Sequence, residues 1–344
     1  MKVLIIGGTK FLGRHLIDAA LQNGHEVTLF NRGTKYSDEA IERVEQIHGD
    51  RNSDLENLGD RRFDAVIDTS GYLPQTVKIS AEFLKEKTGQ YVFISSASVY
   101  PETPAPDYDE TTRTAKLDDE QLKQVAAIDP KGELNGKTLG EHYGALKKLC
   151  EEEIERVMPG RVLNVRAGMI VGAFDWTDRF TYWVMRVAKG GTILAPGTPE
   201  NFVQMIDARD LSEWIIKMIE GGENGIFNVT GKPFEMNFGQ MLGAIRTATE
   251  AEAEFTWADE KFLTENNVQP WSEMPFYLPE SFAEARGFLA MNIDKALEKG
   301  LKFRDFSETV RTVLNWRKTI KDELKAGISA DREAELLEKW HARQ

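Results

Sequence analysis

The stretch Val3-Leu4-Ile5-Ile6-Gly7-Gly8-Thr9-Lys10-Phe11-Leu12-Gly13 decides the fold of this chain of 344 residues. Its four apolar residues predict a buried strand, and the glycines that follow, ahead of a helical pattern, predict a tight strand-to-helix turn. Glycine lets the backbone approach a ligand closely, and the free amides of a helix start attract anions. We therefore expect a dinucleotide pyrophosphate at this turn. A turn without a ligand is the weaker alternative, because further matching residues follow.

Short apolar runs alternate with helical patterns through the first half of the chain. Strands are expected at Val3–Ile6, Val27–Phe30, Ala65–Ile67, Tyr91–Ile94 and Val162–Val165, and later at Ile226–Val229. Helices are expected at about residues 10–23, 75–87, 137–157 and 177–189. Nearly continuous apolar strands indicate burial on both faces, as in a parallel sheet covered by helices. The pattern predicts an α/β fold with a Rossmann-type doubly wound parallel sheet.

The chain beyond Lys232 is mostly helical in pattern, with aromatic residues such as Trp257 and Trp271. This change predicts a smaller, mostly helical C-terminal substrate domain. We assign residues 1–171 and about 202–230 to the dinucleotide-binding domain, and about 172–201 and 231–344 to the substrate-binding domain. The charged stretch 321–344 predicts a solvated amphipathic helix.

One segment, residues 101–136, is long, acidic and contains several prolines. A loop of this length is usually functional or disordered. It is either a surface insertion or a lid over the substrate, and the sequence favours neither.

Composition limits the partners of the protein. The net charge of -13 disfavours binding to nucleic acid or to an anionic membrane. The single Cys150 excludes an intramolecular disulfide, and no cysteine cluster is present to hold a metal. No apolar run is long enough for a signal peptide or a membrane span. We expect a cytoplasmic protein with no metal, membrane or nucleic-acid partner.

The preference for one nicotinamide cofactor is predicted from the glycine turn and from the residues that end the second strand. Lys10 replaces the middle glycine of the turn and brings a positive charge toward the phosphates. The second strand ends at Asn31-Arg32, where a carboxylate would repel a 2′-phosphate and an arginine could pair with it. These residues favour NADP over NAD, although each cation could equally be an exposed surface residue. Asp50-Arg51 is placed to frame an adenine or to cap a helix.

A serine, a tyrosine and a lysine form the candidate catalytic group. Ser96 ends the strand that begins at Tyr91, at the sheet edge where α/β proteins bind ligands. Tyr143 and Lys147 are four residues apart in a predicted helix and therefore share one face. A tyrosine, with an ordinary pKa of about 10, acts as a base near neutrality only where a cation stabilises its phenolate, which Lys147 could supply. The alternatives are a strand-end cap and a packed aromatic side chain.

Together these motifs resemble the extended and atypical branch of the short-chain dehydrogenase/reductase superfamily, the NAD-dependent epimerase/dehydratase-like proteins. The resemblance rests on residues 7–13, Asp50-Arg51, residues 95–100, 143–147 and 166–172, and residues 204–211. It implies that Ser96 binds the substrate oxygen, that Tyr143 exchanges its proton, and that Lys147 lowers the tyrosine pKa and contacts the nicotinamide ribose. The glycine turn and the second strand end also resemble a subgroup that includes isoflavone-reductase-like proteins and chloroplast stem-loop RNA-binding relatives.

The turn, the strand ends and the resemblance together give the expected cofactor site. Its residues are Gly7, Thr9, Lys10, Phe11, Leu12, Gly13, Asn31, Arg32, Asp50, Arg51, Ser70, Gly71, Tyr143, Lys147, Gly168 and Ile170. The function implied is an NAD(P)-dependent oxidoreductase or epimerase that transfers hydride at a carbinol or carbonyl carbon of a small carbonyl or sugar-like substrate. The alternative is a cofactor-binding regulatory or RNA-binding protein on the same fold, against which the net charge argues.

Two further expectations come from the resemblance. Family dehydratases have an acidic pair directly after the catalytic hydroxyl, whereas Ala97-Ser98 follows Ser96 here, so sugar-nucleotide dehydration is disfavoured. Relatives often dimerise by pairing two helices, which here would be residues 75–87 and 137–157, although a monomer would also have such amphipathic helices.

Overall fold

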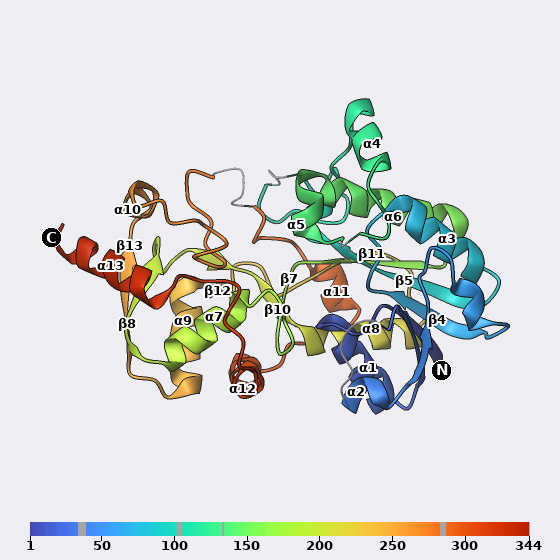
Figure 1. Ribbon diagram of the computed structural model, residues 1–344, viewed down its shortest axis with the longest axis horizontal. Helices are drawn as coiled ribbons and strands as arrows, with labels where there is room; N and C mark the ends of the chain where they lie inside the picture. Colours follow the sequence, from blue (N-terminus) through green and yellow to red (C-terminus); the bar gives the residue numbers. More distant parts are fainter. Residues whose placement is uncertain (34–38, 102–104, 133, 283–286, 344) are drawn as a thin grey trace.

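A seven-stranded sheet forms the centre of the first half of the molecule in this computed structural model (Figure 1). The structure describes residues 1–33, 39–101, 105–132, 134–282 and 287–343. The strands are β1 (Lys2–Ile6), β2 (Glu26–Asn31), β3 (Glu45–His48), β4 (Phe63–Asp68), β5 (Thr88–Ser96), β6 (Val162–Ala167) and β11 (Gly225–Val229), in the order β11-β6-β5-β4-β1-β2-β3. Every neighbouring pair is parallel. The predicted doubly wound sheet is confirmed, and its strand order reverses at β1, the place where such folds bind ligands.

The residues of β1 show why the sheet is covered on both faces. Val3 and Ile5 join one apolar core, whereas Leu4 and Ile6 join the core on the opposite face. Side chains alternate between the faces of a strand, so a wholly apolar strand needs cover on both. Helices α1 (Leu12–Gln22) and α8 (Ala208–Glu220) pack together on one face, and α3 (Pro74–Leu84) and α6 (Tyr143–Val157) on the other (Figure 1).

The helix expected at residues 137–157 is divided. It consists of α5 (Gly136–Leu139), a 3-10 turn at Gly140–His142 and α6. Gly140 interrupts it, because its positive φ of 53° is not helical. Tyr143 therefore lies in the first turn of α6 rather than in the middle of a long helix.

A second apolar core occupies the other half of the molecule (Figure 1). It is built by α7 (Arg179–Ala188), α9 (Phe238–Thr249), α10 (Glu260–Glu265), α12 (Phe306–Arg317), α13 (Ala330–His341), β8 (Gly191–Pro196) and β13 (Ala253–Ala258). The prediction that the chain beyond Lys232 is mostly helical missed β13, which pairs in parallel with β8. Its apolar residues are too few to distinguish a strand from a helix by periodicity.

The remaining elements are short. They are α2 (Glu39–Glu42), α4 (Asp119–Ala126), α11 (Asp294–Glu298), β7 (Met169–Val171), β9 (Phe202–Val203), β10 (Met205–Asp207) and β12 (Met236–Asn237), with 3-10 turns at Leu55–Leu58 and Ala97–Val99. Ile293, Ala296 and Leu301, in and beside α11, pack against the first core, although we had assigned them to the second domain.

The acidic segment is partly packed rather than wholly solvated. Its residues 102–104 and 133 lie outside the described residues. The backbone amide of Asp107 donates to the Ala290 oxygen at 2.7 Å, and that of Asn292 donates to the Tyr108 oxygen at 2.9 Å. Val125 of α4 packs in a small apolar cluster that Tyr143 also contacts. The segment therefore lies against the candidate catalytic tyrosine.

Candidate active site

The glycine turn forms a cradle that only glycine fits. Gly7 and Gly8 have φ angles of 92° and 78°, and a Cβ on Gly7 would lie 2.6 Å from Oγ1 of Thr69. A Cβ on Gly13 would overlap the backbone of Gly8. The N-cap residue of α1, Phe11, gives no side-chain cap to the helix. This geometry leaves a close approach to the helix start, which fits a dinucleotide pyrophosphate. Thr69, whose hydroxyl accepts from the Gly8 amide at 3.1 Å, was missed in the sequence.

The other predicted residues of this turn lead into α1, as expected from the sequence. Thr9 and Lys10 precede Phe11, and Leu12 is the first residue of α1. The Lys10 ammonium lies 5.7 Å from the centre of the Trp176 ring, a contact between segments far apart in the sequence.

The end of β2 carries an amide that lacks a partner. Oδ1 of Asn31 accepts from the Gly33 amide at 2.8 Å, whereas its buried Nδ2 has no hydrogen-bond partner among the described residues. Arg32 is exposed. A buried amide donor without an acceptor is costly, and a ribose or phosphate oxygen would supply one.

Asp50 and Arg51 have partners that the sequence did not predict. Oδ1 of Asp50 accepts from the Asn52 amide at 2.8 Å. The Arg51 guanidinium donates to both carboxylate oxygens of Asp68, at 2.8 and 2.6 Å, and to the Ser80 hydroxyl at 2.8 Å. Burial is the largest single influence on the pKa of Asp68 and acts to raise it, but pairing with Arg51 and hydrogen bonds from Ser70 and Tyr91 together hold this pKa below its usual value. The Arg51 side chain is thus part of a buried ion pair, and its predicted contact with adenine stays a prediction.

The structure brings Ser96 and Tyr143 together. Ser96 ends β5, and its hydroxyl accepts from the Ser98 amide at 3.1 Å. Burial raises the pKa of Tyr143, and a hydrogen bond with Ser96 lowers it by a smaller amount. Gly144 permits this approach, since a Cβ there would overlap the Ser98 carbonyl oxygen.

Lys147 is buried on the same face of α6. Its ammonium donates to the carbonyl oxygens of Gly71 and Ile94 at 2.8 and 2.5 Å, and lies 4.1 Å from the centre of the Phe93 ring. Burial lowers the pKa of Lys147 to about 8. Burial, the largest influence on the Tyr143 pKa, acts in the opposite direction to the predicted effect of Lys147, which stays a prediction.

Tyr72 is a second tyrosine in the site that the sequence reasoning missed. Its ring centre lies 6.5 Å from that of Tyr143 and 5.4 Å from the Lys147 ammonium. Burial raises its pKa. Its position directly after Ser70-Gly71, at the carboxyl end of β4, was the signal available in the sequence.

The other predicted residues border this region from neighbouring strand ends. The Ser70 amide donates to Oδ1 of Asp68 at 3.0 Å, and Gly71 supplies one acceptor for Lys147. The Gly168 amide donates to the Val229 oxygen at 3.0 Å, and Ile170 pairs with Ile206 between β7 and β10.

A buried polar network includes Ser95, the residue before Ser96. Glu151 accepts two bonds from Arg166, at 3.0 and 2.7 Å, and one from the Ser95 hydroxyl at 2.6 Å. Arg166 also donates to the Tyr100 hydroxyl at 2.9 Å, which donates to Asn228 at 2.6 Å. The network joins β5, α6, β6 and β11 around the carboxyl edge of the sheet.

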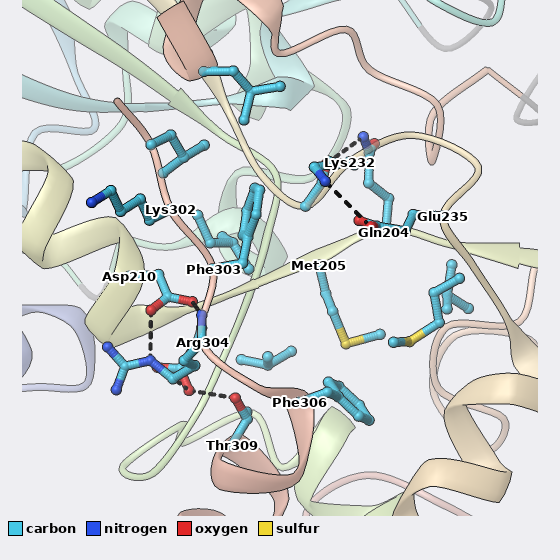
Figure 2. A pocket seen from close by; sticks show the side chains of 18 residues that line it. Gln204, Met205, Asp210, Lys232, Glu235, Lys302, Phe303, Arg304, Phe306 and Thr309 are labelled. Atoms are coloured by element: carbon cyan, nitrogen blue, oxygen red, sulfur yellow. Dashed lines mark hydrogen bonds and ion pairs between the residues drawn. The ribbon is translucent and has the colours of Figure 1, made fainter. Parts of the chain in front are cut away.

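A cavity of about 730 Å³ lies apart from these residues (Figure 2). It is lined by residues of β10, the loop before β12 and the segment that leads into α12, and none of them is a predicted site residue. Its polar side chains pair with one another: Arg304 donates to Asp210 at 2.6 Å, Thr309 to Asp207 at 2.7 Å and Lys232 to Glu235 at 3.3 Å. The cavity therefore offers few uncommitted polar groups to a ligand.

Within the described part of the chain, no group of three or more His, Cys, Asp or Glu side chains could hold a metal ion. No helix in that part has both the length and the apolar character needed to cross a membrane.

Several known proteins are similar to this chain in sequence or in fold. Residues 3–122 match the model of the NAD dependent epimerase/dehydratase family. This match covers the N-terminal part of the chain, from β1 to α4. A chloroplast stem-loop binding protein of 41 kDa b from Arabidopsis thaliana is 26% identical over 253 residues, and the match covers 68% of this chain and 59% of that protein. The chain thus spans less than two thirds of the length of this curated relative.

Similar solved structures extend the likeness of fold to nearly the whole chain. A UDP-glucose 4-epimerase has a TM-score of 0.65 at 17% identity, and the match covers 96% of this chain and all of that one. The enzyme WbmH of Bordetella bronchiseptica, in complex with NAD+, has a TM-score of 0.64 at 14% identity, covering 92% and 98%. The UDP-glucose 4-epimerase of Bifidobacterium longum, in complex with NAD+ and UDP, has a TM-score of 0.63 at 16% identity, covering 93% and 98%. At these identities the likeness establishes the fold alone.

Proposed function

We propose that the chain is an NAD(P)-dependent epimerase or reductase of the short-chain dehydrogenase/reductase type. The observation that carries this proposal is the meeting of Ser96, Tyr143 and the buried ammonium of Lys147, which donates to the Ile94 carbonyl oxygen two residues before Ser96. These groups lie at the carboxyl edge of a sheet whose first turn is a glycine cradle. The match of residues 3–122 to the epimerase/dehydratase family model supports the same class of chemistry.

The three side chains have complementary tasks in this reaction. A bound nicotinamide supplies or accepts hydride. The charge on the substrate oxygen changes as hydride moves, so a proton must move in step. The Ser96 hydroxyl holds that oxygen, and the Tyr143 phenol gives or takes the proton. Lys147 places a positive charge beside them and favours the phenolate.

We propose NADP rather than NAD as the cofactor. The end of β2 presents Asn31 and the exposed Arg32 in place of a carboxylate, and Lys10 adds a cation at the turn. These groups accept a 2′-phosphate without repulsion. Two of the similar structures are complexes with NAD+, so the preference needs a direct comparison of both cofactors.

The substrate proposed is a small carbonyl or sugar-like molecule. The UDP-glucose 4-epimerases among the similar structures favour a sugar nucleotide. Ser96 is followed by Ala97-Ser98 rather than by an acidic pair, which disfavours dehydration of such a molecule.

The proposal is tested first by cofactor binding and then by substrate turnover. The protein is titrated with NADH and NADPH while energy transfer from tryptophan is followed, and binding of at least one is expected. Failure to bind either would refute the enzyme assignment. A screen of sugar nucleotides and small carbonyls then identifies a substrate. Tyr143→Phe should abolish its turnover and keep cofactor affinity, whereas retained turnover would contradict the role of Tyr143.

A regulatory RNA-binding protein is the second candidate function. The observation in its favour is the 26% identity to a chloroplast stem-loop binding protein. The net charge of -13 weighs against it, since RNA binding depends on contacts from cations to phosphates. Titration with a labelled stem-loop RNA at 50 and 200 mM salt decides the matter. Binding that weakens steeply with salt would support it, and no binding at the lower salt would exclude it.

A homodimer through α3 and α6 is part of the same proposal. These helices pack side by side on one face of the sheet (Figure 1). Their exposed residues include Lys78, Glu82 and Glu152. Sedimentation velocity of the wild type and of Glu82→Lys tests this arrangement. A monomer at all concentrations would exclude it.

A further inference from the structure

We propose that Trp176 is a cofactor-contact residue, carried by a strap (Gly172–Thr177) that closes over the pyrophosphate of a bound dinucleotide. The inference rests on the cofactor site of the proposed function and adds a residue that the motifs did not include. Its basis is that the strap, which follows β7, lies against the start of α1, more than 150 residues earlier in the chain.

Two residues of the strap are bound directly to α1. Nε2 of His15 donates to the Ala173 carbonyl oxygen at 3.0 Å. The Phe174 ring centre lies 4.5 Å from the Arg14 guanidinium carbon and 5.7 Å from the His15 ring. These contacts place the strap beside the first turn of α1, where the helix amides attract a pyrophosphate.

The next residues turn the Trp176 side chain outward. Phe174 and Asp178 have φ angles of 68° and 57°, which are uncommon for residues with a Cβ. Asp175 is buried and accepts from the Thr177 hydroxyl at 2.8 Å. Trp176, between the buried Asp175 and Asp178, is 43% exposed. Backbone strain that holds a large apolar ring in solvent is typical of a ligand-binding segment.

The exposed ring lies near the side chain of Lys10, a residue of the glycine turn. The Lys10 ammonium lies 5.7 Å from the ring centre, so Trp176 and Lys10 meet beside the cradle of Gly7 and Gly8. On the other side, the Lys325 ammonium donates to the Trp176 carbonyl oxygen at 3.3 Å, which fixes the strap to the C-terminal part of the chain. A dinucleotide in the cradle is then enclosed by a cation that pairs with its phosphates and by a flat ring that excludes water.

Affinity for NADH and NADPH tests this inference in the full-length protein. Trp176→Ala should weaken the binding of whichever cofactor the wild type prefers by about tenfold, and Trp176→Phe, which keeps an aromatic ring, by at most about threefold. Trp257→Phe is the matched control, because it also removes one tryptophan but lies in β13, and its affinity should equal that of the wild type. Affinity is measured by calorimetry, which does not depend on tryptophan emission.

A second measurement uses the unaltered protein and needs no variant to fold. Oxidation of Trp176 by N-bromosuccinimide, located by peptide mass spectrometry, should be fast in the free protein and slowed at least fivefold by saturating cofactor. If the wild type binds a cofactor but Trp176→Ala binds it equally well and Trp176 is not protected, this inference is wrong and the proposed function stands. If the wild type binds neither cofactor, both are wrong.

Discussion

The ion pair between Glu151 and Arg166 provides the most quantitative test of the structure. Both side chains are about 1% exposed, and two hydrogen bonds of 3.0 and 2.7 Å join them. We consider Glu151→Gln, which keeps the size of the side chain but replaces one carboxylate oxygen by an amide nitrogen. The Arg166 guanidinium then faces a donor at one of its two contacts and has no counter-charge.

The expected loss follows from the burial of the arginine. Breaking a buried ion pair by removing one partner costs about 3–5 kcal/mol, because the other charge stays buried without compensation. The Ser95 hydroxyl also loses a charged acceptor at 2.6 Å, which a hydrogen bond to a neutral oxygen only partly replaces. Since native proteins have net stabilities of about 5–15 kcal/mol, this single change should remove a large part of the total.

Urea unfolding followed by circular dichroism measures the effect, with midpoints compared between variants. The matched control is Glu153→Gln on the same helix, because Glu153 pairs with the exposed Arg156 and its loss should hardly move the midpoint. A second control is Glu151→Leu combined with Arg166→Met, which removes both charges and should recover at least half of the loss. If Glu151→Gln and Glu153→Gln lower the midpoint equally, the reasoning from burial fails.

Three further predictions follow from the site and its surroundings. Burial raises the pKa of Asp175 to about 6. The folded protein therefore keeps a proton that the unfolded chain loses near pH 4. As the pH rises from about 4 to 6, the contribution of Asp175 to the free energy of unfolding should fall by roughly 3 kcal/mol. Melting curves of Asp175→Asn should lack this fall, and an identical pH profile would contradict the raised pKa. Gly144→Ala places a methyl group against the Ser98 carbonyl oxygen and should reduce both stability and turnover. Gly243→Ala in α9, where a Cβ meets no atom within 4 Å, should be neutral or stabilising, and equal losses in the two would argue against that contact. Arg32→Ala should weaken NADPH more than NADH in calorimetric titrations, whereas equal losses would defeat the choice of NADP.

The features that could be predicted from the sequence are those that depend on residues close together in the chain. The apolar run from Val3 to Ile6 and the glycines after it specify a buried strand and a turn, since few other structures accommodate such residues. The same reasoning placed Ser96 at a strand end and put Tyr143 and Lys147 on one face of a helix. All of these placements depend on residues close in sequence.

Contacts between distant segments were not predictable in this way. The strap bound to His15 and the partnership of Arg51 with Asp68 join residues whose separation carries no periodic signal. The sheet strand β13 was missed for a related reason, because it is stabilised by β8 rather than by its own pattern. The burial that raises the pKa of Tyr143 was not predictable either, since the burial of a side chain depends on the whole fold.

Helix α6 carries the candidate catalytic residues and a stabilising glutamate on one face. Tyr143, Lys147 and Glu151 recur at intervals of four residues, so all three point toward the sheet edge. Tyr143 reaches Ser96, and Glu151 holds the preceding Ser95, which fixes the end of β5 from two sides. The two ends of this face should therefore respond differently to mutation: Tyr143→Phe should change turnover with little effect on unfolding, whereas Glu151→Gln should lower stability and disturb Ser96 only through the strand that carries it.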